Sequence, residues 1–173
     1  MYGKLFILFF SFLLTGCAAL KEQTFAIGGS EVAFSVPQQF ESNTFRMQQE
    51  SSQPNIEQNM KDRGLPVSLL KSVKFASITL QVDSDDPNFD IGSIEQLLVT
   101  IALDDQPAMK VATGSFSGFS GKEALLELED TELLDLLSAE SAVYTLEFTV
   151  DELPGAPIEV AIDPEFQVTT SIL

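Results

Sequence analysis

The chain has 173 residues, of which 45% are hydrophobic, so it is long enough for one domain with an apolar core. Nine basic and 26 acidic residues give a formal charge of −17, which excludes a nucleic-acid-binding role because such a surface repels phosphates. There is no histidine and one cysteine, Cys17, so histidine-dependent catalysis, zinc–thiolate sites and intramolecular disulfides are excluded together.

A short apolar segment precedes Cys17. Lys4 is its only charged side chain, and residues 5–14 contain one polar side chain, Ser11. A stretch of ten residues is about half of the roughly 20 that a membrane-spanning helix needs. A charged start, a short apolar stretch and small residues at its end instead predict an export signal that is later removed.

The run Leu14-Thr15-Gly16-Cys17 resembles the lipobox of bacterial lipoproteins. In that family the cysteine sulfur receives a diacylglyceryl group, the peptide before it is cut away and the new amine is acylated. The resemblance implies that Leu14, Thr15 and Gly16 direct processing and that Cys17 is the lipidated first residue. Several acyl chains give a durable anchor, since each buried methylene adds ~0.8 kcal/mol. The alternatives are an ordinary secretory signal with an incidental cysteine, or a buried structural thiol.

The resemblance implies a lipid-anchored protein of the bacterial cell envelope. Residues 1–16 are the signal peptide, and residues 17–23 form a lipidated tether. Ala18 stands where an aspartate would resemble an inner-membrane retention signal, so the outer membrane is favoured if the host has two membranes. The mature chain keeps eight basic and 26 acidic residues, a formal charge of −18. Solubility, a Ca²⁺-rich surrounding or a cationic partner would each account for that acidity.

The first part of the mature chain mixes strands with a loop and helix insertion. Alternating apolar residues predict strands over 24–27 and 31–36. Residues 38–53 are rich in Gln, Ser and Asn and predict a long loop. A helix is expected over 54–63, because Pro54 suits a first turn and Gly64 a C-terminal exit, and residues 67–72 add a helical turn. The insertion therefore spans about residues 38–72.

From Lys74 onward the pattern is that of β-strands. Strands are expected over residues 74–82, 94–103, 109–116, 122–129, 144–150, 158–162 and 166–172, each with alternating apolar residues. Ala76 is expected to point inward with Ile78, and Ala124 with Leu126 and Leu128. One short helix interrupts them at about residues 131–138. The sequence thus predicts a mostly β fold, a single antiparallel Ig-like β-sandwich over residues 24–173.

Residues 74–168 also resemble the Ig-like sandwich of LEA14 and water-stress/hypersensitive-response proteins. The resemblance rests on a small-residue turn at 111–114, a leucine-rich stretch at 133–137, a Tyr144-containing strand and a Leu153-Pro154-Gly155 turn. The family's Asn-Pro-rich element is missing, and Asp86-Pro87-Asn88 is a poor substitute. The resemblance implies a fold and a protective or ligand-holding role, with no catalytic residues to carry over.

One turn has the composition of a calcium site. Oxygen ligands spaced two apart suit Ca²⁺, and five such residues lie together in the chain: Asp83, Asp85, Asp86, Asn88 and Asp90. Pro87 stands where an EF-hand loop needs a third Asp or Asn, and Gly92 comes late. The competing interpretation is a solvated turn between two strands, which the same residue types favour.

A leucine cluster lies in the predicted short helix and consists of Leu133, Leu134, Leu136 and Leu137. It is interpreted as a plug at the open end of the sandwich core, or as a lid over an apolar cavity or a partner-binding surface. No catalytic motif is present. The sequence therefore predicts a non-catalytic binding or structural module that contacts another envelope component. The alternatives are a carrier of an apolar ligand between the sheets and a Ca²⁺-stabilised adhesin-like module.

Overall fold

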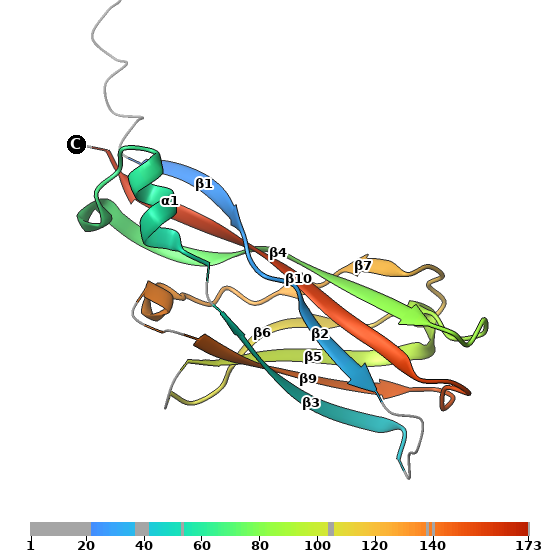
Figure 1. Cartoon of the computed structure of the whole chain (residues 1–173). Coiled ribbons are helices and arrows are strands. Elements are labelled where there is room, and N and C mark those ends of the chain that lie inside the picture. The colour runs from blue at the N-terminus through green and yellow to red at the C-terminus, as the bar shows by residue number, and fades with distance from the viewer. Residues whose placement is uncertain are drawn as a thin grey trace, which may run out of the picture.

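The protein was analysed as a computed structural model, which describes residues 22–36, 42–52, 54–103, 106–137, 139 and 141–172. Two antiparallel β-sheets lie face to face and one short α-helix covers the end of one of them (Figure 1). The prediction of a mostly β antiparallel sandwich is therefore confirmed. The signal residues Leu14, Thr15 and Gly16 and the predicted lipidation site Cys17 lie outside the described residues.

The first sheet is built around two long central strands, β4 (Leu70–Ser84) and β10 (Ile158–Ser171). The other side of β10 is shared by β1 (Glu22–Gly28) and β2 (Val32–Val36), which pair with its later and earlier halves. The short β7 (Glu123–Leu125) pairs with β4. Along the sheet the order is β1/β2, β10, β4 and β7.

The second sheet has the strand order β3, β9, β5, β6 and β8. Its strands are β3 (Thr44–Ser52), β9 (Ser141–Val150), β5 (Ile94–Leu103), β6 (Met109–Gly114) and β8 (Glu127–Leu128). Inward residues alternate along β9, where Leu146, Phe148 and Val150 are buried as the sequence predicts. Sheet edges are left at β3 and β8.

The strands of the first half of the chain pair with those of the second half in reverse order. β1 and β2 pair with β10, β3 with β9, β4 with β7 and β5 with β6. The chain is thus one long nested hairpin rolled into two sheets. This connection order is that of a jelly roll, and it refines the Ig-like description of the two packed sheets.

Helix α1 (Ile56–Asp62) covers the ends of β1, β4 and β10 (Figure 1). Ile56 and Met60 are buried in the core, and the Arg63 guanidinium lies 4.5 Å from the centre of the Phe25 ring on β1. The helix begins at Ile56, two residues later than the predicted start at Pro54. Asn55 is its N-cap, and the Asn55 side chain accepts a hydrogen bond from the backbone N–H of Gln58. This end of the molecule is called the α1 end.

Three 3₁₀ turns complete the fold: Val67–Leu69, Ile91–Ser93 and Leu134–Leu137. The first occupies part of the helical turn predicted for 67–72, which ends where β4 begins. The third occupies the helix predicted for about 131–138, but it is a single tighter turn. The turns over 83–93, 117–123 and 151–157 meet at the opposite end from α1, which is called the loop end.

The predicted loop over residues 38–53 is wrong for residues 44–52, which form β3. Only Phe45 is buried and Met47 half-buried in this strand, so its apolar alternation is too short to stand out from the Gln and Ser side chains. Pairing with β9 over nine residues supplies the order that the local sequence does not specify. Residues 38–41 and 53 lie outside the described part.

Two predicted side-chain orientations are also wrong. Ala76 is exposed, because β4 carries one extra residue against β10 at this point and the alternation restarts at Ser77. The strand predicted over 122–129 breaks at Leu126, where the chain passes from β7 in one sheet to β8 in the other. Leu128 is consequently exposed, although Leu126 is buried as expected.

Tyr144 places an unpaired hydroxyl inside the sandwich. The residue is 2% exposed, its burial raises the pKa of the phenol, and its hydroxyl makes no hydrogen bond to any described residue. A buried polar group without a partner costs free energy. The neighbouring hydroxyl of Thr145, also buried, instead accepts a hydrogen bond from the Gln48 amide at 3.2 Å.

We expect Tyr144→Phe to raise the free energy of unfolding by about 1 kcal/mol, because it removes a buried hydroxyl that has no partner. Thr145→Val is the control: it removes a hydroxyl that has a partner, so it should lower stability. Urea unfolding of both variants measures the two effects. A less stable Tyr144→Phe protein would show that the hydroxyl is satisfied, for example by a buried water.

Candidate functional site

The acidic turn predicted to bind calcium lies at the loop end, and its carboxylates are held by protein groups. Asp83 receives a hydrogen bond from the Lys122 ammonium at 2.8 Å. Asp86 accepts two backbone N–H groups, from Asn88 at 3.0 Å and from Gly155 at 2.8 Å. These bonds tie the turn after β4 to the turns before β7 and β10.

Asp90 has a similar structural role in the same turn. Its carboxylate accepts from the backbone N–H of Gly92 at 2.8 Å and from that of Gly121 at 3.3 Å. The Ile91 N–H donates to the Gly121 carbonyl at 3.1 Å, and the Asp151 N–H donates to the Ser93 carbonyl at 3.2 Å. Asp90 therefore caps the 3₁₀ turn and joins two loops of the loop end, and the Ser93–Asp151 bond adds the third.

The five predicted calcium ligands are neighbours in the turn, but they do not converge. Among the described residues, no group of three or more acidic, cysteine or histidine side chains is arranged to hold a metal ion. Asn88 contributes its backbone N–H to Asp86, and Asp83 and Asp86 point to different partners. The calcium site stays a prediction, and the hydrogen bonds favour the interpretation of an Asp/Asn turn.

Two carboxyl groups of this turn have lowered pKa values. The hydrogen bond and charge of Lys122 lower the pKa of Asp83, and Asp83 in turn raises the pKa of Lys122. The backbone N–H groups of Asn88 and Gly155 lower the pKa of Asp86. Both carboxylates are thereby stabilised in the ionised form.

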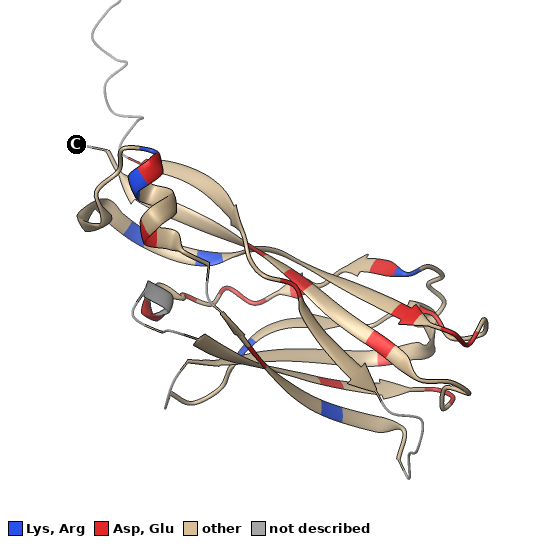
Figure 2. Ribbon diagram, in the orientation of Figure 1, with Lys and Arg blue, Asp and Glu red and all other residues tan. Residues whose placement is uncertain are grey.

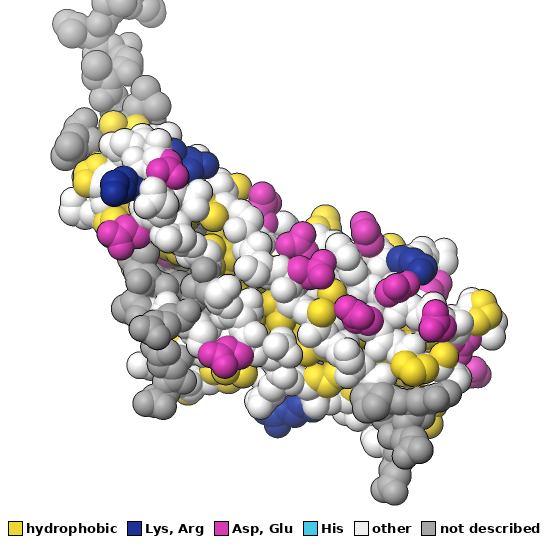
Figure 3. All heavy atoms as spheres, in the orientation of Figure 1, with side chains coloured by type: hydrophobic (Ala, Val, Ile, Leu, Met, Phe, Trp, Pro, Cys, Tyr) yellow, Lys and Arg dark blue, Asp and Glu magenta, His cyan; other side chains and the backbone are white. Residues whose placement is uncertain are grey.

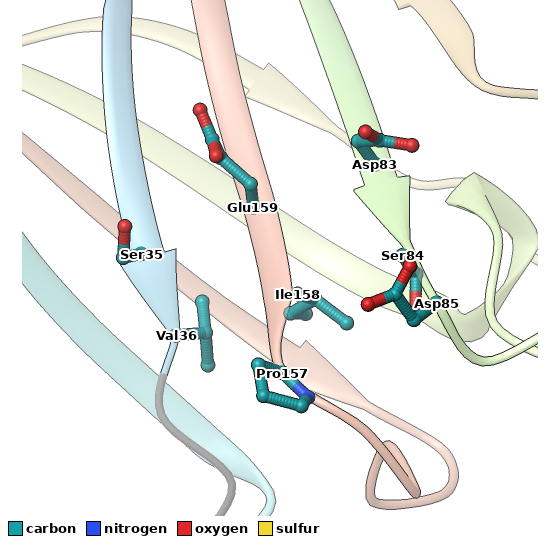
Figure 4. A pocket seen from close by; sticks show the side chains of 8 residues that line it. All are labelled: Ser35, Val36, Asp83, Ser84, Asp85, Pro157, Ile158 and Glu159. Carbon is teal, nitrogen blue, oxygen red and sulfur yellow. The ribbon is translucent and has the colours of Figure 1, made fainter.

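A shallow hollow of about 430 Å³ opens beside this turn, on the outer rim of the sandwich (Figure 4). Val36, Pro157 and Ile158 give it apolar lining, and Asp83, Asp85 and Glu159 surround it with carboxylates. The other lining residues are Ser35 and Ser84. Because the hollow joins the ends of β2, β4 and β10, no local sequence pattern could indicate it.

Acidic residues lie along the strands as well as at the loop end, where few basic residues accompany them (Figure 2). The three segments 83–93, 117–123 and 151–157 carry seven acids and one base, Lys122, a formal charge of −6. The acids are Asp83, Asp85, Asp86, Asp90, Glu123, Asp151 and Glu152. At the α1 end, β1, α1 and residues 63–71 together carry three bases and three acids, a formal charge of zero. The molecule is therefore electrically asymmetric along its length.

The leucine cluster is divided between the core and the surface. Leu133 is fully buried, and its backbone N–H donates to the Val73 carbonyl at 2.8 Å, whereas Leu134 is 37% exposed. Leu136 and Leu137 complete the 3₁₀ turn. Glu132 fixes the segment to β4 by accepting from the Val73 N–H at 2.7 Å. For Leu133 these contacts favour the plug over the lid.

Sequence reasoning missed the exposed leucines on the segment that crosses between the sheets. Leu125 is 71% exposed on β7 and Leu128 is 37% exposed on β8. Phe119 and Leu153, at the loop end, are 48% and 49% exposed. Phe116 and Phe119 bracket Gly118 in the sequence; Phe119 is the exposed member of this pair and Phe116 is buried.

No helix in the described part of the chain has the length and apolar character needed to cross a membrane.

No family model matches the sequence, and no curated protein matches it. Among solved structures, the chain is similar to the capsid protein in "Crystal structure of decameric BFDV Capsid Protein", with 10% identity over 87% of this chain and 99% of that one and a TM-score of 0.40. It is also similar to Desmodium yellow mottle tymovirus, with 10% identity over 93% and 95% and a TM-score of 0.29. Both TM-scores lie below 0.5, so neither likeness bears on function.

We expect Asp86→Ala to lower the melting temperature more than Asp86→Asn, because asparagine keeps one acceptor for the Gly155 N–H. The pKa of Asp86 is lowered on folding from an ordinary value of 3.8, so its stabilisation is present above that pH and lost as the pH falls below it. The gap between wild type and Asp86→Ala should therefore close in acid. Thermal melts from pH 7 to pH 3 measure it.

The same melts distinguish this role from calcium binding. If Asp86 only ties loops together, adding Ca²⁺ or a chelator leaves the melting temperature of the wild-type protein unchanged. A melting temperature that rises with Ca²⁺ and falls with chelator would contradict the loop-tying interpretation and support the metal site.

Proposed function

We propose that this chain is a lipid-anchored protein of the bacterial envelope. Acyl groups on Cys17 hold it to a membrane, and its β-sandwich acts without catalysis by contacting another envelope component through the loop end. The observation that carries the proposal is the placement of Cys17. It lies five residues before Glu22, the first residue of β1, and Glu22 is at the α1 end, opposite the acidic loops.

The charge distribution supports a partner with positive charge. Asp85 and Glu159 line the hollow at the loop end and have no ion-pair partner among the described residues. The exposed apolar side chain of Pro157 lies beside them, whereas Val36 and Ile158 are 1% and 2% exposed. A carboxylate rim next to apolar lining suits a lysine or arginine side chain, whose methylenes need apolar contact and whose head needs an anion.

Confinement to a membrane supplies the mechanism. A domain held at a surface meets other components of that surface at a raised effective concentration, so a weak contact is enough. A shallow acidic surface without catalytic geometry fits that kind of contact. The outer membrane is the favoured location in a host with two membranes, because Ala18 rather than aspartate follows Cys17.

Cys17→Ser removes the sulfur that accepts the lipid, so we expect the protein to move from the membrane fraction to the soluble fraction, measured by fractionation and immunoblotting. Ala18→Asp is the matched control, since it keeps the cysteine and should keep the protein in membranes while shifting it toward the inner one. Mass spectrometry of the native N-terminus gives the decisive reading. An unmodified Cys17, or a terminus well beyond it, would refute the anchor.

The partner contact is tested by a pair of charge changes at each end. Asp85→Asn with Glu159→Gln removes two charges beside the hollow, and Glu57→Gln with Asp62→Asn removes two on α1. We expect only the first pair to weaken cross-linking to the partner in the intact envelope, by about tenfold or more at low salt, and to reduce its salt sensitivity. Equal effects of the two pairs would mean that net charge alone matters.

A further inference from the structure

We infer that the α1 end rests on the bilayer that holds Cys17, with an apolar tip in contact with the lipid headgroup region. The apolar tip consists of Pro66, Val67, Leu69 and Ile172. This inference rests on the proposed lipid anchor, which brings the α1 end to the membrane. The surface itself is assigned from the arrangement of residues at the α1 end.

The first argument is the reach of the chain. Five residues separate Cys17 from Glu22, and a fully extended chain of that length spans at most about 18 Å. Glu22 pairs with Ser171 on β10, and Thr170 pairs with Leu70 at the start of β4. Neighbouring strands lie about 4.8 Å apart, so the start of β4 is roughly 10 Å from the start of β1. A lipid on Cys17 therefore holds this end of the sheet close to the membrane.

The second argument is the composition of the tip. Ile172 is 41% exposed, Pro66 is exposed, and Val67 and Leu69 are half-buried in the short turn before β4. Leu65 and Leu70, on either side, instead pack against the core. The turn thus offers partly exposed apolar side chains at the end of the molecule, outside the main core cluster. Interfacial segments use such side chains at the boundary between headgroups and acyl chains.

The third argument is charge. Lys61, Arg63 and Lys71 flank the tip and offset the acids of the α1 end, which is therefore formally neutral; those acids are Glu22, Glu57 and Asp62. Figure 3 shows basic, acidic and hydrophobic side chains together at this end. Lys71 also pairs with Glu22 at 2.7 Å, which fixes the start of β4 to the start of β1. Long basic side chains beside an apolar contact reach anionic headgroups. The loop end, with its formal charge of −6, is repelled by the same headgroups. The long axis of the molecule therefore points away from the membrane surface.

The absence of tryptophan provides a clean test. Leu69→Trp places one fluorophore on the tip, and Leu153→Trp places one at the loop end. Residues 17–173, which include every described element, are coupled through the only thiol, Cys17, to a maleimide phospholipid in vesicles containing anionic lipid. We expect the Leu69→Trp emission to shift to shorter wavelength and to be quenched by brominated lipid several-fold more than the Leu153→Trp emission.

Charge is tested in the same chains. Lys61→Glu and Lys122→Glu change the net charge equally at opposite ends. Only Lys61→Glu should reduce the quenching of Leu69→Trp, and it should do so in anionic vesicles at low salt and not in neutral ones. Val67→Trp repeats the measurement if the Leu69→Trp chain does not fold.

Equal quenching at both ends, or none at the tip, would overturn the inference. So would a tip emission that is already shifted without lipid in a dimeric protein, since the occupant would then be a second copy of the chain. Because the coupling to vesicles is chemical, these outcomes do not depend on whether the cell acylates Cys17. Mass spectrometry of the native N-terminus decides that question separately.

Discussion

The antiparallel pairing of β4 with β10 is the interaction on which the rest of the structure depends. These two strands are central in their sheet, and their register runs from Ser84 opposite Ile158 to Leu70 opposite Thr170. A strand rises about 3.3 Å per residue, so 14 residues of β10 separate the α1 end from the loop end by ~45 Å. That distance is several times the Debye length of about 8 Å in physiological salt. The charges at one end are thus electrostatically independent of events at the other.

The sequence predicted the strands whose apolar residues alternate and failed where order comes from distant pairing. β5 and β9 could be predicted from the sequence, because their inward residues, such as Val99 and Leu146, alternate without a break. β3 has only Phe45 buried, and nothing local distinguishes its Gln and Ser side chains from a loop. Its partner β9 begins almost 90 residues later, at Ser141 opposite Ser52. The extra residue at Ala76 likewise follows from the register with β10, which no local pattern encodes.

The candidate site was predicted in part. The composition of residues 83–90 correctly marked a turn that is rich in oxygen acceptors, but composition does not tell what the oxygens bind. The partners of Asp86 and Asp90 are backbone N–H groups of Gly155 and Gly121, which lie 69 and 31 residues further along the chain. The residues that line the hollow beside Glu159 are distant in sequence and come together only in the fold. The same is true of the residues of the tip around Leu69. A jelly-roll connection brings such distant turns together at two ends, so most of the surface chemistry of this chain is non-local.

The distribution of charge separates two explanations of the acidity. Solubility alone requires a large net charge, and it is satisfied by acids spread evenly over the surface. Here the loops of one end carry seven acids and one lysine, whereas β1, α1 and residues 63–71 at the other end carry equal numbers of acids and bases. Several loop-end acids hold backbone N–H groups in place, but Asp85 and Glu159 do not form ion pairs with the described residues, and they lie beside apolar lining. Loop structure does not account for these two carboxylates. In the function proposed above, they provide selectivity for a cationic partner.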